Sequence, residues 1–253
     1  MQIQARDLMG GLAKGLNVIE AFTADRPRLS ISDAAEIAGL DRATARRCLL
    51  TLAELGYCGY DGKYFTVTPK VLRLGTGCLA SMPLPRIVQP WLDKLSDEIG
   101  QSTSVSILDG GEIVYVARAS QQRVMSISLM AGSRLPAYCT SMGRVLLAAL
   151  PVDDAQRVVG STRLPARTSR TRTDPSELMQ ILSDVRANGF ASIDQEVELG
   201  LRSVAVPLVN ARKQVVAALN VGLAATDEPL SAVEARYLPA LQRMRSDLSM
   251  ILG

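Results

Sequence analysis

The chain has 253 residues, of which 47% are hydrophobic and 21% charged, and its net charge is +3. These values are typical of a folded protein of one or two domains and argue against disorder, and a charge of +3 by itself indicates no nucleic-acid partner. The sequence contains no histidine. Because histidine is the usual general base and the commonest metal ligand, we expect no histidine-based catalytic site and no metal site. We also expect no cofactor, because the dinucleotide-like spacing of "GTGCLA" at 75–80 follows a helix start instead of a buried strand.

Cysteine spacing and apolar run length indicate the compartment. The four cysteines form no C-x-x-C pair, so neither a disulfide framework nor a zinc site is signalled. The longest apolar runs, such as 145–150, are far shorter than the roughly 20 residues that a spanning helix needs, and no signal-like segment precedes the first helical pattern. We therefore expect a cytoplasmic protein.

The first predicted elements are three short helices, which the apolar spacing places over 11–23, 30–38 and 42–55. Ser30 is a suitable N-cap for the second helix and Asp41 for the third. The second and third helices are therefore joined by a tight turn.

Two β-rich runs, 57–60 and 63–68, follow on either side of Asp61-Gly62, and this pattern predicts a hairpin with a type I′ turn. A further helix is expected from Thr68-Pro69 to about residue 80. Pro83 and Pro85 then predict a break, which we take as the domain boundary.

The second part of the chain alternates between strand pairs and helices. β-rich runs lie at 103–108, 113–118, 125–130, 190–194, 203–209 and 215–223. Helical patterns lie at 86–99, 143–150, 153–159, 176–188 and 231–252. Because the strands come in adjacent pairs, we expect an α+β fold with an antiparallel sheet and helices on its faces.

The order helix, helix, tight turn, helix and hairpin is that of a winged helix-turn-helix. Its third helix would turn a polar face toward a DNA major groove, and the hairpin would form the wing. Arginine suits this face because its guanidinium binds guanine or phosphate. The predicted DNA-binding residues are Arg42, Thr44, Arg46, Arg47 and, on the wing, Lys63. The alternatives are an ordinary solvated face and a protein-interaction module that binds no DNA.

Two segments of the second part carry polar residues of interest. Ser141 lies near the start of a helix, where free N–H groups attract carboxylates, although it also suits an ordinary N-cap position. Asp194 and Glu196 lie on a connection between strands, either as solvated charges or as the acid/base pair of an enzyme acting on a small molecule.

Four segments resemble the IclR family of bacterial transcriptional regulators. They are "GLNVIEAF", "AEIAGLDRATARRCLLTLAELGY" with "YFTVTPKVLRLG", "GSRLPAYCTSMGRVLLAALP", and "GLRSVAVPLVN" through "VVAALNVG". The third is most similar to the subgroup that controls protocatechuate, 4-hydroxybenzoate and β-ketoadipate catabolism. The resemblance covers the chain from about residue 11 to 252.

The resemblance implies a regulator of an aromatic-compound catabolic operon rather than an enzyme, with a winged helix-turn-helix at 10–70. A linker helix and break at 71–85 would lead to an effector-binding and oligomerisation domain at 86–253, related to GAF and PAS sensor folds. The implied partners are double-stranded operator DNA, an aromatic or dicarboxylic acid effector, a second copy in a homodimer or homotetramer, and RNA polymerase. Such a protein would be associated with the nucleoid.

The resemblance also implies an effector pocket. Its expected residues are Ser141, Met142, Asp194, Ser203, Asn220 and Gly222. Asp194 would accept a hydrogen bond from a ligand hydroxyl, and Arg134 is a candidate for neutralising a ligand carboxylate. The apolar pattern of the helix beyond the proline break concerns oligomerisation instead. We expect its stripe of Ile87, Trp91 and Leu95 to be buried against a second copy of the chain.

Overall fold

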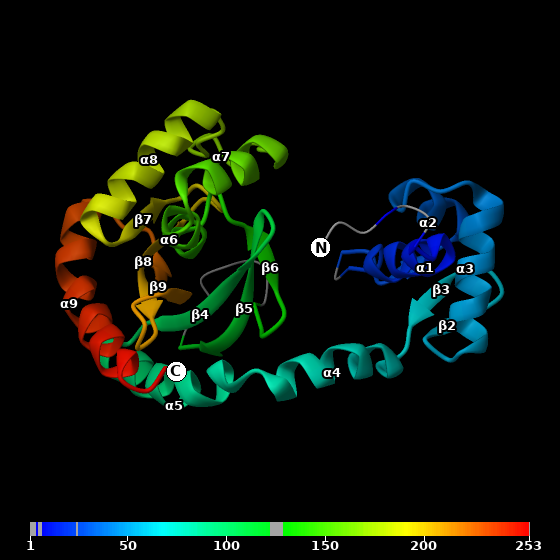
Figure 1. The fold of residues 1–253 in the computed structure, drawn as a ribbon, viewed down its shortest axis with the longest axis horizontal. Coiled ribbons are helices and arrows are strands. Elements are labelled where there is room, and N and C mark those ends of the chain that lie inside the picture. Colours follow the sequence, from blue (N-terminus) through cyan, green and yellow to red (C-terminus); the bar gives the residue numbers. More distant parts are fainter. Residues whose placement is uncertain (1–3, 5–6, 24, 122–128, 253) are drawn as a thin grey trace. The chain divides into compact units, whose positions relative to one another are not determined.

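The computed structural model divides into two units, residues 1–81 and 82–253, which are described separately (Figure 1). It describes residues 4, 7–23, 25–121 and 129–252, apart from the side chains of 78–80. Most of the strand predicted at 125–130 lies outside the described residues.

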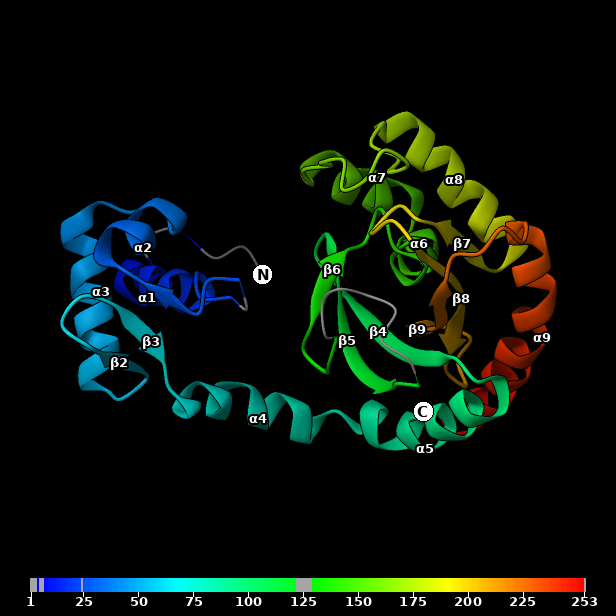
Figure 2. The ribbon, with the colours of Figure 1, turned by 180° about the vertical axis from the view of Figure 1, so that it is seen from behind.

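The first unit packs three helices against a small sheet. The helices are α1 (Gly10–Glu20), α2 (Ile31–Ile37) and α3 (Arg42–Glu54), and the antiparallel sheet has the order β1 (Arg28–Leu29), β3 (Phe65–Val67), β2 (Cys58–Tyr60). In Figure 2 the sheet lies beside α3. The three predicted helices and the two strands of the hairpin are confirmed, whereas β1 is too short for its sequence to show a strand period.

The predicted caps of this unit are present. Ser30 and Asp33 form a reciprocal capping box at the start of α2, with the Ser30 N–H donating to the Asp33 carboxylate over 2.9 Å. The Asp41 carboxylate accepts from the Thr44 N–H at 2.9 Å. These bonds satisfy N–H groups that have no partner within the helix, and so they fix where α2 and α3 begin.

The predicted turn of the hairpin is wrong. Tyr60 pairs with Phe65, so the loop has four residues instead of two. The Asp61 carboxylate accepts from the N–H groups of Lys63 at 2.9 Å and Tyr64 at 2.7 Å. A type I′ turn needs positive φ at both central residues, but of the pair Asp61-Gly62 only Gly62 has it, at 102°.

The helical segment after the hairpin breaks at one residue. A 3₁₀ turn (Pro69–Val71) leads into α4 (Leu72–Ser81), and α5 (Pro83–Ile99) follows Met82, whose backbone is extended. The predicted start of α5 at Arg86 is wrong because Pro83 and Pro85 both lie in its first turn. Proline has no backbone N–H, but an N–H in the first turn of a helix has no acceptor within that helix, so proline costs no hydrogen bond there.

The second unit is built on a six-stranded sheet in which every neighbouring pair is antiparallel, as predicted. Its order is β6 (Arg134–Pro136), β5 (Glu112–Ala119), β4 (Ser102–Asp109), β9 (Val215–Ala224), β8 (Leu201–Val209), β7 (Ala191–Asp194). The three-residue strand β6 was not predicted.

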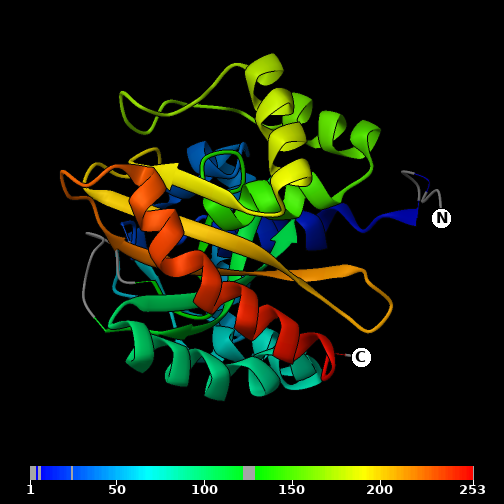
Figure 3. The same ribbon diagram turned by 90° about the vertical axis from the view of Figure 1, so that its left-hand side faces the viewer.

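Helices cover both faces of this sheet (Figures 1 and 3). On one face lie α5 and α9 (Leu230–Ser249), which enclose an aliphatic core with Val105 and Val221. On the other face α6 (Ser141–Ala149) packs on β8 and β9, and α8 (Pro175–Asn188) and α7 (Val152–Ser161) lie beyond it. Because side chains alternate along a strand, one face of β4 is apolar and the other carries small polar residues.

The stripe of Ile87, Trp91 and Leu95 is divided in the structure. Leu95 is buried, whereas Ile87 and Trp91 are half-buried and pack partly against the core beneath α5 and α9. Leu95 is therefore part of the unit's own core, and the role of Ile87 and Trp91 in an oligomer stays a prediction. No helix of the described residues is long and apolar enough to cross a membrane.

Candidate functional site

The outer face of α3 carries the predicted DNA-binding residues. Ala45 lies on the inner face of α3 and is buried. Arg42, Arg46 and Arg47 are exposed, and Thr44 is half-buried. Among the described residues none forms an ion pair with these three arginines. Their guanidinium groups are therefore available to phosphates and base edges.

The loop between β2 and β3 adds positive charge to this unit. The ammonium group of Lys63 lies 5.0 Å from the centre of the Tyr64 ring. The guanidinium of Arg28, on β1, lies 4.8 Å from the same ring. Arg28 was missed because the strand that places it beside the wing was not predicted.

A cavity in the second unit lies between the sheet and the start of α6. The empty space within its outline, together with the part that lies open to solvent, is about 460 Å³. It is lined by Ser102, Tyr115, Arg118, Leu129, Leu135, Thr140, Ser141, Met142, Val197, Leu201, Ser203, Asn220 and Gly222. The structure thus brings together five of the six residues expected in the effector pocket; Asp194 is not among those lining it.

The start of α6 is fixed by several close contacts. Thr140 accepts from the Gly143 N–H at 3.1 Å, and Ser141 Oγ lies 2.8 Å from Ser203 Oγ. A Cβ added at Gly143 would lie 2.2 Å from the carbonyl oxygen of Ala137. Thr140, and not Ser141, is therefore the N-cap of α6, and its side chain occupies one of the N–H groups at the start of the helix.

Arg118 is a cavity residue that sequence reasoning missed. It is half-buried on β5, and its Nη1 donates to Ser104 Oγ at 2.8 Å. Burial lowers the pKa of its guanidinium, an effect that the charge interaction with Tyr115 opposes. Among the described residues no carboxylate forms an ion pair with it.

Asn220 lines the same cavity and carries an unsatisfied acceptor. The residue is only 8% exposed, and its Oδ1 is buried with no hydrogen-bond partner among the described residues. An unpaired buried acceptor is costly and rare in folded proteins, so this oxygen is a polar group that the fold leaves unsatisfied.

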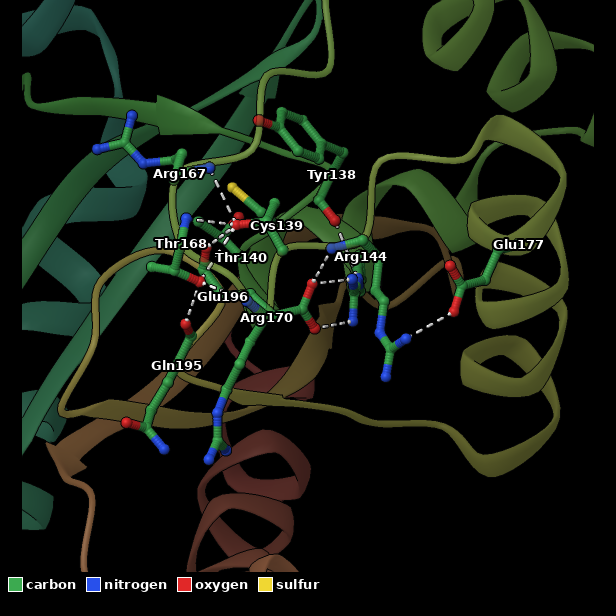
Figure 4. A network of polar contacts seen from close by, with 12 residues as sticks. Tyr138, Cys139, Thr140, Arg144, Arg167, Thr168, Arg170, Glu177, Gln195 and Glu196 are labelled. Carbon is green, nitrogen blue, oxygen red and sulfur yellow. Dashed lines mark hydrogen bonds and ion pairs between the residues drawn. The ribbon is translucent and has the colours of Figure 1, made fainter.

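A buried ion pair ties α6 to the connection between β7 and β8 (Figure 4). Arg144 donates Nη1 and Nη2 to the two carboxylate oxygens of Glu196, at 2.9 and 2.6 Å. Arg144 also donates Nε to the carbonyl oxygen of Tyr138 at 2.9 Å, and Glu196 accepts from the Arg172 N–H at 3.1 Å. The side chains of Arg144 and Glu196 are 5% and 9% exposed.

Two threonines extend this network to the backbone. Thr168 Oγ1 donates to the carbonyl oxygen of Gln195, and Thr171 Oγ1 donates to that of Glu196, each at 2.7 Å. Figure 4 shows Thr168, Gln195 and Glu196 together beside the start of α6. The network fixes the connection that supplies Val197 to the cavity wall.

Asp194, which was expected in the pocket, forms ion pairs with two arginines instead. Asp194 accepts from Arg202 Nε at 2.7 Å and from Arg170 Nη1 at 2.5 Å. Burial would raise the pKa of Asp194, but hydrogen bonds from Arg202 and Gln195 and the charges of Arg202 and Arg170 outweigh burial and lower it overall. Its predicted role as a ligand acceptor therefore has no support in the geometry.

The ion pairs of the structure also bear on the predicted role of Arg134 and on the enzyme alternative. Arg134 pairs with Glu112 at 2.7 Å and Asp109 at 2.8 Å and is not among the residues lining the cavity. Since Asp194 and Glu196 are both held by arginines, neither carboxylate is arranged as a general acid or base.

Comparison with known proteins identifies both units. The family model described as the IclR helix-turn-helix domain matches residues 11–62, and that of the bacterial transcriptional regulator IclR C-terminal domain matches residues 76–250. The Pca regulon regulatory protein of Pseudomonas putida is 45% identical over 243 residues, which cover 96% of this chain and 84% of the relative.

Two solved structures show the same architecture. An IclR family transcriptional regulator from Brucella abortus is 26% identical and has a TM-score of 0.83, covering 98% of this chain and 94% of that one. The inducer-binding domain of a double mutant of the PobR transcription factor from Acinetobacter, solved with 3-hydroxybenzoic acid, is 29% identical. It has a TM-score of 0.62 and covers 66% of this chain and 98% of the domain. The chain belongs to the IclR family of bacterial transcriptional regulators and is a DNA-binding regulator, not an enzyme.

Proposed function

We propose that the protein controls an operon for the catabolism of aromatic acids, and that an aromatic carboxylic acid bound in the cavity changes its affinity for operator DNA. The observation that carries this proposal is the cavity itself, which is lined by an arginine with no ion pair among the described residues and by a pair of serine hydroxyls. The related PobR domain was solved with an acid of this class.

The outer face of α3 is the proposed contact with operator DNA. Arg42, Arg46 and Arg47 are exposed cations, and Thr44 lies in the first turn of the same helix. In this arrangement the guanidinium groups of the arginines bind base edges, while Thr44 and the wing residue Lys63 contact the phosphate backbone. A regulator that binds operator DNA acts in the cytoplasm, on the nucleoid.

A homodimer or homotetramer is part of the proposal, because one winged helix contacts only a short half-site and two copies read a palindrome. The support comes from large apolar side chains on the first unit. Leu12, Leu16, Leu55 and Leu74 are 61%, 44%, 53% and 53% exposed and line one hollow beside α3. Burial of these leucines against a second copy would remove apolar surface from water. RNA polymerase is the further partner through which the bound regulator would act.

Operator selection tests this function. Duplexes retained by the full-length protein would be selected from random DNA, and affinity for the selected duplex would be measured by fluorescence anisotropy with and without 4-hydroxybenzoate or protocatechuate. We expect a palindromic sequence and an affinity that changes when an acid is added. Absence of sequence preference, or no response to any aromatic acid, would contradict the proposal.

A further inference from the structure

We propose that Arg28, on β1, binds the phosphate backbone of DNA, and that the ring of Tyr64 positions Arg28 and Lys63 for this contact. The proposed function places the DNA contact on the outer face of α3 and on Lys63. Arg28 and Tyr64 extend that contact to the first strand of the unit, and their role does not depend on an effector.

Arg28 and Tyr64 lie on the outer face of the three-stranded sheet. The strand register pairs Arg28 with Thr66, and both side chains are exposed. The next pair, Leu29 and Phe65, is buried. Because side chains alternate between the two faces of a strand, Tyr64, which precedes Phe65, projects to the outer face with Arg28.

The ring of Tyr64 contacts two cationic groups. The guanidinium of Arg28 lies 4.8 Å from the ring centre and the ammonium of Lys63 lies 5.0 Å from it, so the two cations are no more than about 10 Å apart. Two like charges held this close repel each other, and an anion that binds both relieves the repulsion. Side chains that are already held in place also lose less conformational freedom when they bind.

The contact with the ring leaves the hydrogen-bonding edge of Arg28 free. A guanidinium stacks through its face, whereas its five N–H groups point outward in its plane and match the geometry of a phosphate. All aspartate and glutamate residues of the chain lie among the described residues, and none of them forms an ion pair with Arg28. Arg28 therefore has the donors that a phosphate needs and no carboxylate that occupies them.

Asp61, in the loop between β2 and β3, is the carboxylate whose charge interacts with Arg28. Hydrogen bonds from the N–H groups of Tyr64 and Lys63 lower its pKa, and the charge of Arg28 contributes to the shift. These two bonds, at 2.7 and 2.9 Å, direct the carboxylate toward the backbone of its own loop. The two cations and this one carboxylate leave the surface with a net positive charge, which attracts the phosphate backbone.

The order of the elements places Arg28 on the side of the phosphates. In a helix-turn-helix the first helix crosses the DNA backbone and the second lies in the major groove. These two helices are α2 and α3 here, and α2 begins at Ile31, directly after the Ser30 cap and three residues after Arg28. Arg28 thus contacts phosphates and not base edges, and its contribution to affinity is independent of the DNA sequence.

Fluorescence anisotropy with the full-length protein tests this contact on two duplexes of equal length, the selected operator and a random sequence, between about 50 and 200 mM salt. Arg28→Gln should weaken binding to both duplexes by a similar factor, about fivefold to tenfold per bound copy of the chain. The slope of log affinity against log salt should become less steep by about 0.9 per copy, since one phosphate contact is lost. Arg28→Lys should keep the slope. Arg163→Gln removes an exposed arginine of the second unit and should change neither quantity.

Variants of Tyr64 separate the position of the cations from their charge. Tyr64→Leu keeps both cations, so the salt slope should stay that of the wild type while affinity for both duplexes falls about threefold, because the side chains are no longer held before binding. Tyr64→Phe keeps the ring and should bind like the wild type. A purely structural role of Tyr64 would lower the urea midpoint of Tyr64→Leu without this combination of lower affinity and unchanged slope.

The outcomes separate this inference from the proposed function. Wild-type affinity and slope of folded Arg28→Gln on both duplexes would overturn the contact, and so would a loss confined to the operator with an unchanged slope, which would place Arg28 on a base edge. Undiminished binding by Tyr64→Leu would overturn the role of the ring. If Arg28→Gln fails to give a native circular dichroism spectrum, the ratio between Tyr64→Leu and Tyr64→Phe decides the inference. No acid is present in these measurements, so a missing effector response would contradict the proposed function and leave this inference standing.

Discussion

The hydroxyl oxygens of Ser141 and Ser203 lie 2.8 Å apart, although 62 positions separate them in the chain. The bond joins the start of α6 to β8 at the wall of the cavity. One hydroxyl donates to the other, and the accepting hydroxyl keeps its own proton for a ligand. This contact shows why residues far apart in the sequence form one candidate site.

Ser141→Leu is expected to abolish effector binding, because a leucine side chain would occupy the cavity and remove the hydroxyl pair. Calorimetry with the hydroxybenzoate that binds the wild type would measure the loss. Ser161→Leu, on an exposed position of α7, is the matched control and should bind normally. Normal binding by a folded Ser141→Leu variant would mean that the pocket is elsewhere.

Gly143→Ala is expected to destabilise the second unit by about 1–3 kcal/mol, as overpacking does. The new Cβ would lie 2.2 Å from the Ala137 carbonyl oxygen and 2.3 Å from its Cα, so backbone must move. Gly160→Ala in α7 meets no atom within 4 Å and should stabilise the helix by about 0.5–1 kcal/mol. Urea denaturation compares the two, and equal effects would contradict the close packing of α6.

Glu196→Gln is expected to cost about 3–5 kcal/mol of unfolding free energy, because it leaves the buried Arg144 without its anion. In the control, Asp154→Asn breaks the exposed pair with Arg157 and should cost about 0–1 kcal/mol. Chemical denaturation measures both variants. A cost for Glu196→Gln as small as that of Asp154→Asn would show that the buried pair does not hold the connection to α6.

Acid is expected to weaken the fold in part through Asp194. Its pKa is lowered in the folded state from the usual 3.8, so the unfolded state takes up the proton first as the pH falls. The stabilisation from Asp194 is therefore complete above pH 3.8 and is lost as the pH falls through the lowered pKa. The stability gap between the wild type and Asp194→Asn should be constant near neutral pH and shrink in acid, as thermal unfolding at several pH values would show. A gap independent of pH throughout would refute this account of the ion pairs.

Arg47→Ala is expected to weaken operator binding by about 1–3 kcal/mol without affecting the fold, since its side chain is exposed and the core below α3 is untouched. Anisotropy with operator and scrambled duplexes measures the change. Arg157→Ala, in the second unit, serves as the control. Unchanged affinity of Arg47→Ala for both duplexes would remove α3 from the DNA contact.

The sequence predicts most of the fold because the elements that matter carry local signals. Ser30 and Asp41 mark helix starts through the hydrogen bonds of their own side chains, and the paired β-rich runs indicate antiparallel strands. The turn after Tyr60 was mistaken because Asp61 stabilises a longer loop with its carboxylate, which competes with the two-residue turn. β1 and β6 exist through pairing with a neighbouring strand and have too few residues for a pattern of their own.

The candidate site could be predicted only in part. Ser141 is indicated by its place near a helix start, and Ser203 and Asn220 by resemblance. Arg118 was missed, although an arginine in the otherwise apolar strand "IVYVARA" is an available signal. Asp194 was misplaced because its partners become visible only when three distant segments are brought together. Register and ion pairing depend on tertiary contacts, so a single sequence does not determine them.

The most direct test measures operator affinity as a function of effector, and effector affinity as a function of operator, for the wild type and Arg118→Met. Because linkage is reciprocal, a regulator must show the same factor in both directions. For the wild type we predict that hydroxybenzoate changes the affinity for the operator by a certain factor, and that the operator changes the affinity for hydroxybenzoate by the same factor. Arg118→Met should bind the operator but should not respond to the same concentration of acid. Wild-type protein that binds both ligands with no effect of one on the other would contradict the account.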